Sequence, residues 1–185
     1  MVIERTRGWV LLQTKAHYPP GIFRLPTGTI HARETADAAM LRELHEEANL
    51  VPGEFRRICR VEYEIDGGRK DFFTDVYLIE APRGELRPND AAEDINAWRE
   101  AMLSELTSVA ADLRRLDPPW QGWGIFRSVL HDLVPRLLEA RVNAPLVAQR
   151  SSELSVPAAV APTESTVAPA AQTEPPRKPR KRRSR

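Results

Sequence analysis

The sequence has little cysteine and no long apolar run. Cys59 is its only cysteine, which excludes an intramolecular disulfide and a zinc site built from several cysteines. No apolar segment approaches the ~20 residues that cross a bilayer. The N-terminal residues also lack an apolar stretch followed by a small-residue cleavage site. These absences predict a cytoplasmic protein with no membrane span and no secretory signal.

Net charge is also low, but the charges are unevenly placed. The formal net charge is +1, yet seven of the last nine residues are Lys or Arg, which leaves 20 basic and 26 acidic residues in the first 176. From about residue 144 onward, Pro, Ala, Ser, Thr and Val dominate. We therefore predict a folded domain over residues 1–143 and a disordered tail over 144–185. The basic end indicates either a solubility tail or a weak, salt-sensitive contact with nucleic acid or anionic lipid.

Short apolar or alternating segments bounded by turn residues predict four strands. They span residues 9–14, 22–26, 58–65 and 70–80. The last two flank a Gly67–Gly68 turn, which is typical of a hairpin.

Three segments predict helices. They span residues 36–48, 102–116 and 125–140. Thr35 is the expected N-cap of the first helix, and Asn49 takes the left-handed position after it. The apolar face of this helix is expected to comprise Met40, Leu41, Leu44 and Ala48. Strands mixed with helices predict a layered α/β fold.

The first predicted helix carries an unusual set of acidic residues. Glu43, Glu46 and Glu47 stand at i, i+3 and i+4, so a helix projects their carboxylates from one face. Like charges on one face repel each other and lower helix stability. Their presence indicates cation binding, and such oxygen ligands suit Mg²⁺ or Mn²⁺ better than Zn²⁺.

Residues 28–50 resemble the signature of the Nudix hydrolase family, G-x5-E-x7-R-E-U-x-E-E-x-G-U, in which U is aliphatic. Eight of the nine specified positions match: Gly28, Glu34, Arg42, Glu43, Leu44, Glu46, Glu47 and Leu50. Asn49 replaces the second glycine, which at a left-handed position should cost less than about 1 kcal/mol. The resemblance extends over about residues 1–140.

The resemblance implies an α/β/α sandwich with a mixed sheet and C-terminal helices. It also implies metal-dependent hydrolysis of a pyrophosphate bond in a nucleoside diphosphate linked to another group. The implied metal ligands are the Gly28 carbonyl and the carboxylates of Glu43, Glu46 and Glu47. The same three glutamates are the candidate catalytic residues, and they share the general-base role. Glu34 and Arg42 are expected to form an ion pair that fixes the loop and helix geometry.

A further acidic ligand is implied outside the signature. Family members often carry an acid a few residues before a Trp, which resembles Glu93 and Trp98 here. We favour Glu93 over the adjacent Asp94, and a solvated acidic loop is the alternative.

Three residues near the signature are candidates for substrate binding. Lys15 and Arg24 flank the turn before it and are candidates to meet substrate phosphates, whereas a solvated strand end is the alternative. Phe23 is a candidate to stack on a base, against core packing.

The N-terminus departs from the family pattern. Only eight residues precede the strand that starts at Trp9, where the family usually has a full first strand, so Val2–Glu4 is interpreted as its remnant. Either this strand is short or the sequence starts late. A missing strand would expose a sheet edge and favour homodimerisation or instability.

The resemblance does not select one nucleotide-like substrate. Nucleoside triphosphates, oxidised nucleotides, nucleotide sugars, ADP-ribose and dinucleoside polyphosphates all stay open. Where ADP-ribose enzymes of the family have a proline, this chain has Ile65 and Asp66. Two other functions also stay open: an enzyme of RNA 5′ ends recruited by the basic tail, and a non-catalytic nucleotide sensor. Sensors of this family usually lose the signature glutamates, which this chain retains.

Overall fold

A five-stranded mixed sheet forms the centre of the molecule in the computed structural model, which describes residues 1–65 and 68–142. The strands are β1 (Val2–Thr6), β2 (Trp9–Lys15), β3 (Glu54–Ile65), β4 (Gly68–Glu80) and β5 (Ile95–Met102). Their order in the sheet is β3-β4-β1-β2-β5. Strand β1 runs parallel to β4, whereas the other neighbours are antiparallel.

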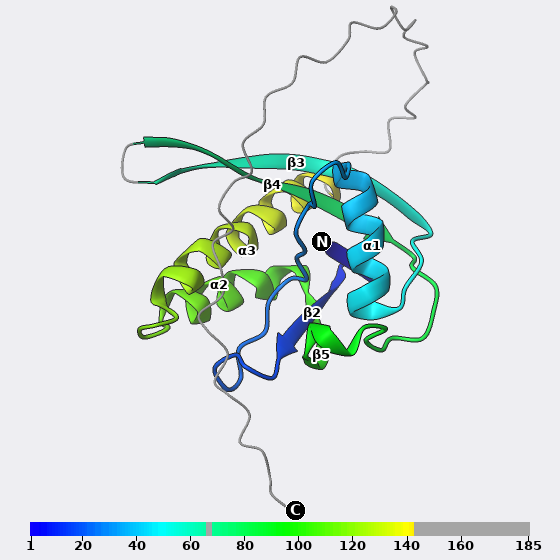
Figure 1. The fold of residues 1–185 in the computed structure, drawn as a ribbon, viewed down its shortest axis with the longest axis horizontal. Helices are drawn as coiled ribbons and strands as arrows, with labels where there is room; N and C mark the ends of the chain where they lie inside the picture. Colours follow the sequence, from blue (N-terminus) through cyan, green and yellow to red (C-terminus); the bar gives the residue numbers. More distant parts are fainter. Residues whose placement is uncertain (66–67, 143–185) are drawn as a thin grey trace, which may run out of the picture.

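Helices cover both faces of this sheet (Figure 1). They are α1 (Ala36–Ala48), α2 (Leu106–Arg114) and α3 (Gln121–Val142), with short 3₁₀ turns η1 (Ala91–Glu93) and η2 (Leu103–Glu105). One apolar cluster packs α1 on the sheet, and a larger one packs α2 and α3 on the opposite face. The predicted α/β/α sandwich is confirmed. Of the helices in the described part of the chain, none is long and apolar enough to span a bilayer.

Alternation along β2 divides its side chains between the two clusters. Leu11 packs with Met40 and Leu44 of α1. Val10 and Leu12 point to the other face, into the cluster that contains α2 and α3. The next residues on the Leu11 side are polar, and they lead to the candidate site.

Helix α1 has the predicted bounds and the predicted ends. The Thr35 hydroxyl accepts a hydrogen bond from the Ala38 N–H at 3.2 Å, and Asn49 is left-handed with φ 54°. The Asn49 amide also donates to the Glu85 carbonyl at 3.1 Å, a bond that glycine cannot make. The prediction that Leu41 faces the core is wrong: it is 38% exposed, because it lies about 100° around the helix from Met40.

The interpretation of Val2–Glu4 as a short first strand is confirmed, and the strand is slightly longer than expected. Val2–Thr6 forms strand β1, which pairs with β4 on one side and with β2 on the other. It is therefore a central strand, and the edge strands are β3 and β5. The exposed edge from which we predicted a homodimer does not arise at β1, so dimerisation loses that argument.

Other predicted boundaries shift. Segment 22–26 contributes only an isolated bridge between Arg24 and Gln13 instead of a strand. Strand β5 was not predicted, and the helix expected over 102–116 is a 3₁₀ turn followed by α2. Helix α3 begins at Gln121, earlier than expected. The predicted tail over 144–185 and Gly67 of the predicted turn lie outside the described residues.

A buried histidine joins α3 to the segment that leads into the signature. The His131 Nε2 atom accepts from the Leu25 N–H at 3.0 Å, and its Nδ1 donates to the Arg127 carbonyl at 2.9 Å. The bond to Nε2 requires the neutral ring, because a protonated Nε2 cannot accept. Burial, the largest cause, lowers the pKa of His131 from 6.5 to about 4.

We expect this histidine to make stability depend on pH. Between pH 6.5 and about 4 the unfolded chain protonates its histidine while the folded chain does not, so the free energy of unfolding falls as the pH is lowered. The shift corresponds to about 3 kcal/mol. Urea unfolding from pH 8 to pH 4 should show a shallower decline for His131→Gln, whose amide oxygen can still accept from Leu25. Equal slopes in both proteins would contradict this role.

Candidate functional site

The candidate site lies where the polar end of β2 meets the C-terminal half of α1. Gln13 and Lys15 follow Leu11 at alternate positions, so they extend the row of β2 side chains beneath α1. On α1, Glu43 and Glu47 stand one turn apart on its buried side. Buried carboxylates of one helix therefore face an amide and an ammonium of the sheet.

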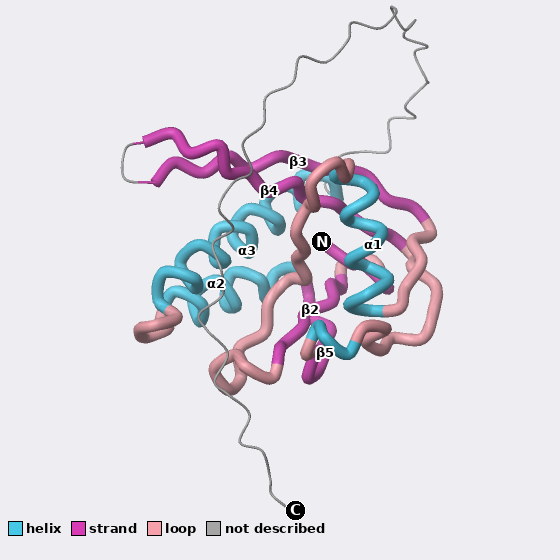
Figure 2. Tube along the Cα trace, viewed as in Figure 1, coloured by secondary structure: helices cyan, strands magenta, loops and turns pink. Residues whose placement is uncertain are grey.

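A loop far along the chain brings in another glutamate. The segment between β4 and β5 passes the C-terminal end of α1 (Figure 2). The N–H groups of Asn89 and Asp90 donate to the Glu46 carbonyl at 2.9 and 3.1 Å, which satisfies an acceptor that the helix end leaves unpaired. Asp90 then caps the η1 turn through the Ala92 N–H at 2.7 Å. These bonds place Glu93, the last residue of η1, next to α1.

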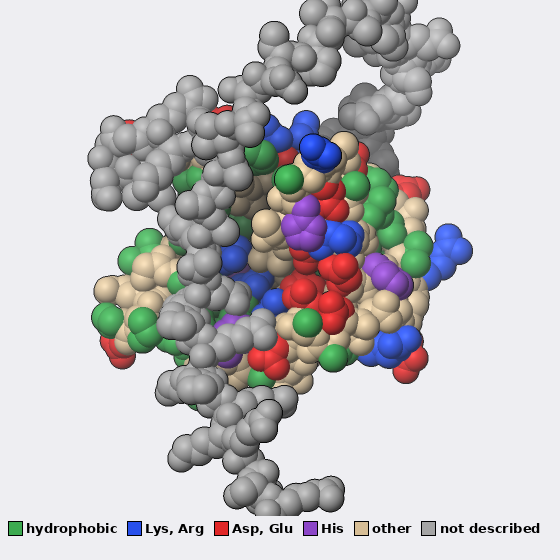
Figure 3. Space-filling view, viewed as in Figure 1, with side chains coloured by type: hydrophobic (Ala, Val, Ile, Leu, Met, Phe, Trp, Pro, Cys, Tyr) green, Lys and Arg blue, Asp and Glu red, His purple; other side chains and the backbone are tan. Residues whose placement is uncertain are grey.

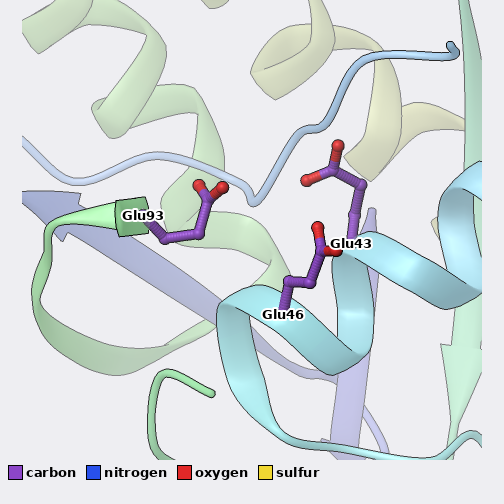
Figure 4. Close-up of side chains that lie close together, drawn as sticks. All are labelled: Glu43, Glu46 and Glu93. Atoms are coloured by element: carbon purple, nitrogen blue, oxygen red, sulfur yellow. The ribbon is translucent and has the colours of Figure 1, made fainter. Parts of the chain in front are cut away.

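Three carboxylates converge on one point. Oxygen atoms of Glu43, Glu46 and Glu93 lie within 4.8 Å of one another (Figure 4). On the molecular surface, acidic side chains gather beside α1 (Figure 3). The structure thus brings Glu93 together with two signature glutamates, as the resemblance implied. Asp94, the alternative, lies instead 3.4 Å from the His17 Nδ1 atom.

Glu47 lies deeper than this group and is 1% exposed. Its Oε1 accepts from the Gln13 Nε2 at 2.8 Å and lies 3.4 Å from the Lys15 Nζ. Its Oε2, like the Oε1 of Gln13, has no hydrogen-bond partner within the described part of the chain. Burial, the largest cause, raises the pKa of Glu47, whereas a nearby cation would favour its charged form. An unpartnered buried carboxylate oxygen and a set of hard oxygen donors fit a divalent cation.

Arg42 links the glutamates to one another. Its Nε and Nη2 donate to the Glu34 carboxylate at 2.9 and 3.1 Å, which confirms the predicted ion pair. This contact lowers the pKa of Glu34 to about 2. The Nη1 atom also lies 2.9 Å from oxygens of both Glu43 and Glu46, which the sequence analysis did not anticipate. Arg42 therefore reduces the repulsion between the carboxylates on its own helix.

Gly28 makes room for Glu43. A Cβ atom at residue 28 would lie 1.9 Å from the Glu43 Cδ and 2.0 Å from its Cγ. The Glu43 Oε1 also accepts from the Thr29 N–H at 3.0 Å, so the loop and the helix touch through this carboxylate. The role of the Gly28 carbonyl as a ligand stays a prediction.

The candidate phosphate contacts lie elsewhere than expected. Lys15 is 8% exposed, and its Nζ lies 2.9 Å from the Glu93 Oε2. Arg24 is 1% exposed and donates to the Tyr18 hydroxyl at 2.8 Å and to the Thr27 hydroxyl at 2.9 Å. The alternative, that both side chains lie at a solvated strand end, is wrong, because both are buried and neither presents its charge to solvent. Contact of either side chain with substrate phosphates stays a prediction.

One further candidate, Phe23, and one residue that was not predicted, Gln13, lie near the site. Phe23 packs against the larger core cluster, and the Arg99 guanidinium lies 5.4 Å from its ring centre, which favours the core-packing alternative. Gln13 was not predicted, although it is fully buried and binds Glu47. The signal for it was its alternation with Lys15 at the end of β2.

Comparison with known proteins gives a consistent result. Residues 1–122 match the NUDIX domain family. The ADP-ribose pyrophosphatase of Methanocaldococcus jannaschii is 26% identical over 123 residues, which cover 66% of this chain and 70% of that protein.

Two solved structures share the fold. One is a MutT described for Aliivibrio salmonicida and Vibrio cholerae, with 16% identity, a TM-score of 0.51, and coverage of 75% of this chain and 92% of that one. The other is an ADP compounds hydrolase, with 14% identity, a TM-score of 0.53, and coverage of 76% and 69%. At these sequence identities, the similarity shows a shared fold and no more.

Proposed function

Since this chain belongs to the NUDIX family of hydrolases, we propose that it hydrolyses the pyrophosphate bond of a nucleoside diphosphate linked to another group, with Mg²⁺ or Mn²⁺ as cofactor. The observation that carries the proposal is the convergence of carboxylates from α1 and η1 within 4.8 Å. The unpartnered buried oxygen of Glu47 supports it independently. We assign the activity to residues 1–143 and expect a cytoplasmic location, and we leave the basic tail as a candidate nucleic-acid contact.

Charge explains why a cation is needed. The substrate is polyanionic, and a cluster of glutamates repels it. A bound divalent cation neutralises the phosphates, polarises them and lowers the pKa of a bound water. The residues proposed to hold cations are Gly28, through its carbonyl, and Glu43, Glu46, Glu47 and Glu93. Turnover is therefore expected to require the metal.

The protein's own groups then act on the attacking water. One of Glu43, Glu46 and Glu47 takes its proton as the water oxygen bonds to phosphorus, and the bond from phosphorus to the bridging oxygen breaks. The products are two phosphate monoesters. Arg42 fixes Glu43 and Glu46 through the bonds described above, so either of these two is already oriented to act as the base when substrate arrives.

The first substrate to test is ADP-ribose, because a relative bears that name. We expect wild-type protein with Mg²⁺ or Mn²⁺ to release AMP and ribose 5-phosphate, and chelation with EDTA to stop the release. Nucleotide sugars, dinucleoside polyphosphates, nucleoside triphosphates, 8-oxo nucleotides and 5′-triphosphate RNA belong in the same screen.

The screen separates the alternatives. RNA turnover that falls on deletion of residues 176–185 would favour the RNA 5′-end enzyme. Nucleotide binding without metal-dependent turnover of any compound would contradict the proposed hydrolase and favour a sensor.

A further inference from the structure

Lys15 contacts both Glu93, the glutamate of the β4–β5 loop, and Glu47, the most buried glutamate of α1. Its Nζ lies 2.9 Å from the Glu93 Oε2 and 3.4 Å from the Glu47 Oε1. The side chain leaves β2 on the face that α1 covers, and it is 8% exposed. A lysine this buried is rarely found unless it is paired. Its ammonium therefore belongs to the carboxylate cluster as a fixed internal cation.

We propose that Lys15 is a positioning residue of the metal site: it holds the Glu93 carboxylate against the cluster, ready to bind a divalent cation. The inference rests on the proposed function, because the metal site is part of it. This role is distinct from the substrate-phosphate contact that the sequence suggested for Lys15.

The need for such a residue follows from the way Glu93 is supported. Glu93 ends a three-residue 3₁₀ turn, and its side chain is about a quarter exposed. Its carboxylate lies within 4.8 Å of those of Glu43 and Glu46, which repel it toward solvent. Nothing in the η1 backbone prevents the side chain from following that repulsion. The ammonium of Lys15 opposes it.

Two cations thus serve two sides of the cluster. Arg42 binds Glu43 and Glu46 on the helix side, both at 2.9 Å. Lys15 binds Glu93 on the loop side. Partners of this kind orient ligating carboxylates, and their loss typically weakens metal affinity about 10- to 100-fold.

The rival explanation is that Lys15 only repels the metal, which predicts the opposite change in metal affinity. A cation that merely sits near a metal site repels the metal, so its removal should tighten metal binding. Positioning and repulsion therefore predict changes of opposite sign. The sign of the change in Mn²⁺ affinity decides between them.

The test measures Mn²⁺ binding without substrate, by electron paramagnetic resonance of free Mn²⁺. We expect Lys15→Met to weaken the affinity about 10- to 100-fold, and Lys15→Arg to restore most of it because a charged donor is retained. In a Glu93→Gln background, Lys15→Met should have little further effect. Circular dichroism checks the fold of each variant, and Lys15→Gln replaces Lys15→Met if the latter does not fold.

Three results would overturn the inference, and they can be told apart. Unchanged or tighter Mn²⁺ binding by folded Lys15→Met, with normal binding by the wild type and weak binding by Glu47→Gln, would refute the role of Lys15 alone. Absence of saturable Mn²⁺ binding by the wild type would refute the proposed metal-dependent function as well. If Lys15→Met weakened Mn²⁺ binding equally in the wild-type and Glu93→Gln backgrounds, positioning through the Glu93 carboxylate would also be excluded.

Discussion

Replacing Glu47 by Gln should reduce turnover by on the order of 10³-fold while raising the stability of the metal-free protein. The amide keeps the shape of the side chain and its bond to Gln13 but removes the negative charge proposed to hold the cation. Loss of about 4 kcal/mol of transition-state stabilisation is typical for such an electrostatic group. Near wild-type turnover at saturating Mg²⁺ would exclude Glu47 from the reaction.

The gain in stability follows from the raised pKa of Glu47. Because the folded-state pKa lies above the unfolded one, the folded protein binds the proton more tightly, and stability is lost as the pH rises through the folded pKa. The neutral amide escapes this loss. Thermal melting in EDTA should therefore show a more stable variant at pH 8 and little difference below the ordinary glutamate pKa.

A matched control separates site effects from charge effects. Glu85→Gln removes one carboxylate from a side chain that is 84% exposed, and it should leave both turnover and melting unchanged. Glu93→Gln should lower turnover less than Glu47→Gln, because Glu93 is the more exposed of the two. A Glu47→Gln variant that melts earlier than wild type in EDTA at pH 8 would show that the buried carboxylate stabilises the fold.

Substituting Ala for Gly28 should cost about 10²-fold in turnover with little change in stability. The new methyl group would lie 1.9 Å from the Glu43 Cδ, so that side chain must rotate away. Its bonds from the Thr29 N–H and the Arg42 Nη1 would break. Misplacement of a reacting group by about 1 Å can cost 10²-fold. A side chain moves more easily than backbone, so the melting temperature should change little.

Gly122→Ala is the control for this variant. A Cβ atom at residue 122 would meet nothing within 4 Å, and the residue lies in α3. Gly122 is the second residue of α3, where alanine is the better helix former, so activity should be retained and melting unchanged or slightly higher. Steady-state kinetics and thermal melting of both variants test the pair. Full activity of Gly28→Ala would mean that Glu43 works from another position.

Local signals explain what the sequence could predict. Helix α1 was predicted to the residue because its cap, its helical spacing and the left-handed Asn49 all lie within one short segment. The sandwich and the signature glutamates came from the same segment, through its resemblance to a family, whereas Glu93 came from the family pattern outside it. The ion pair of Arg42 with Glu34 is also local in sequence, and the structure contains it.

Long-range contacts explain what it could not. Strand β5 is an edge strand with mixed polarity, and it is a strand because it pairs with β2. The short β1 is a strand because neighbours pair with it on both sides. Lys15 reaches Glu93 across 78 positions, and no local pattern encodes such a pair. The burial of Arg24 likewise depends on the fold around it.

The docking of the β4–β5 loop on the end of α1 has a consequence for the newly synthesised chain. Glu93 can join Glu43 and Glu46 only after β4 has found its place beside β1 and the loop has reached the helix. Such distant contacts form late, because long chain segments must first be closed. A nascent chain that has made α1 therefore holds an incomplete set of ligands, and full affinity for cations is expected to mark the end of folding.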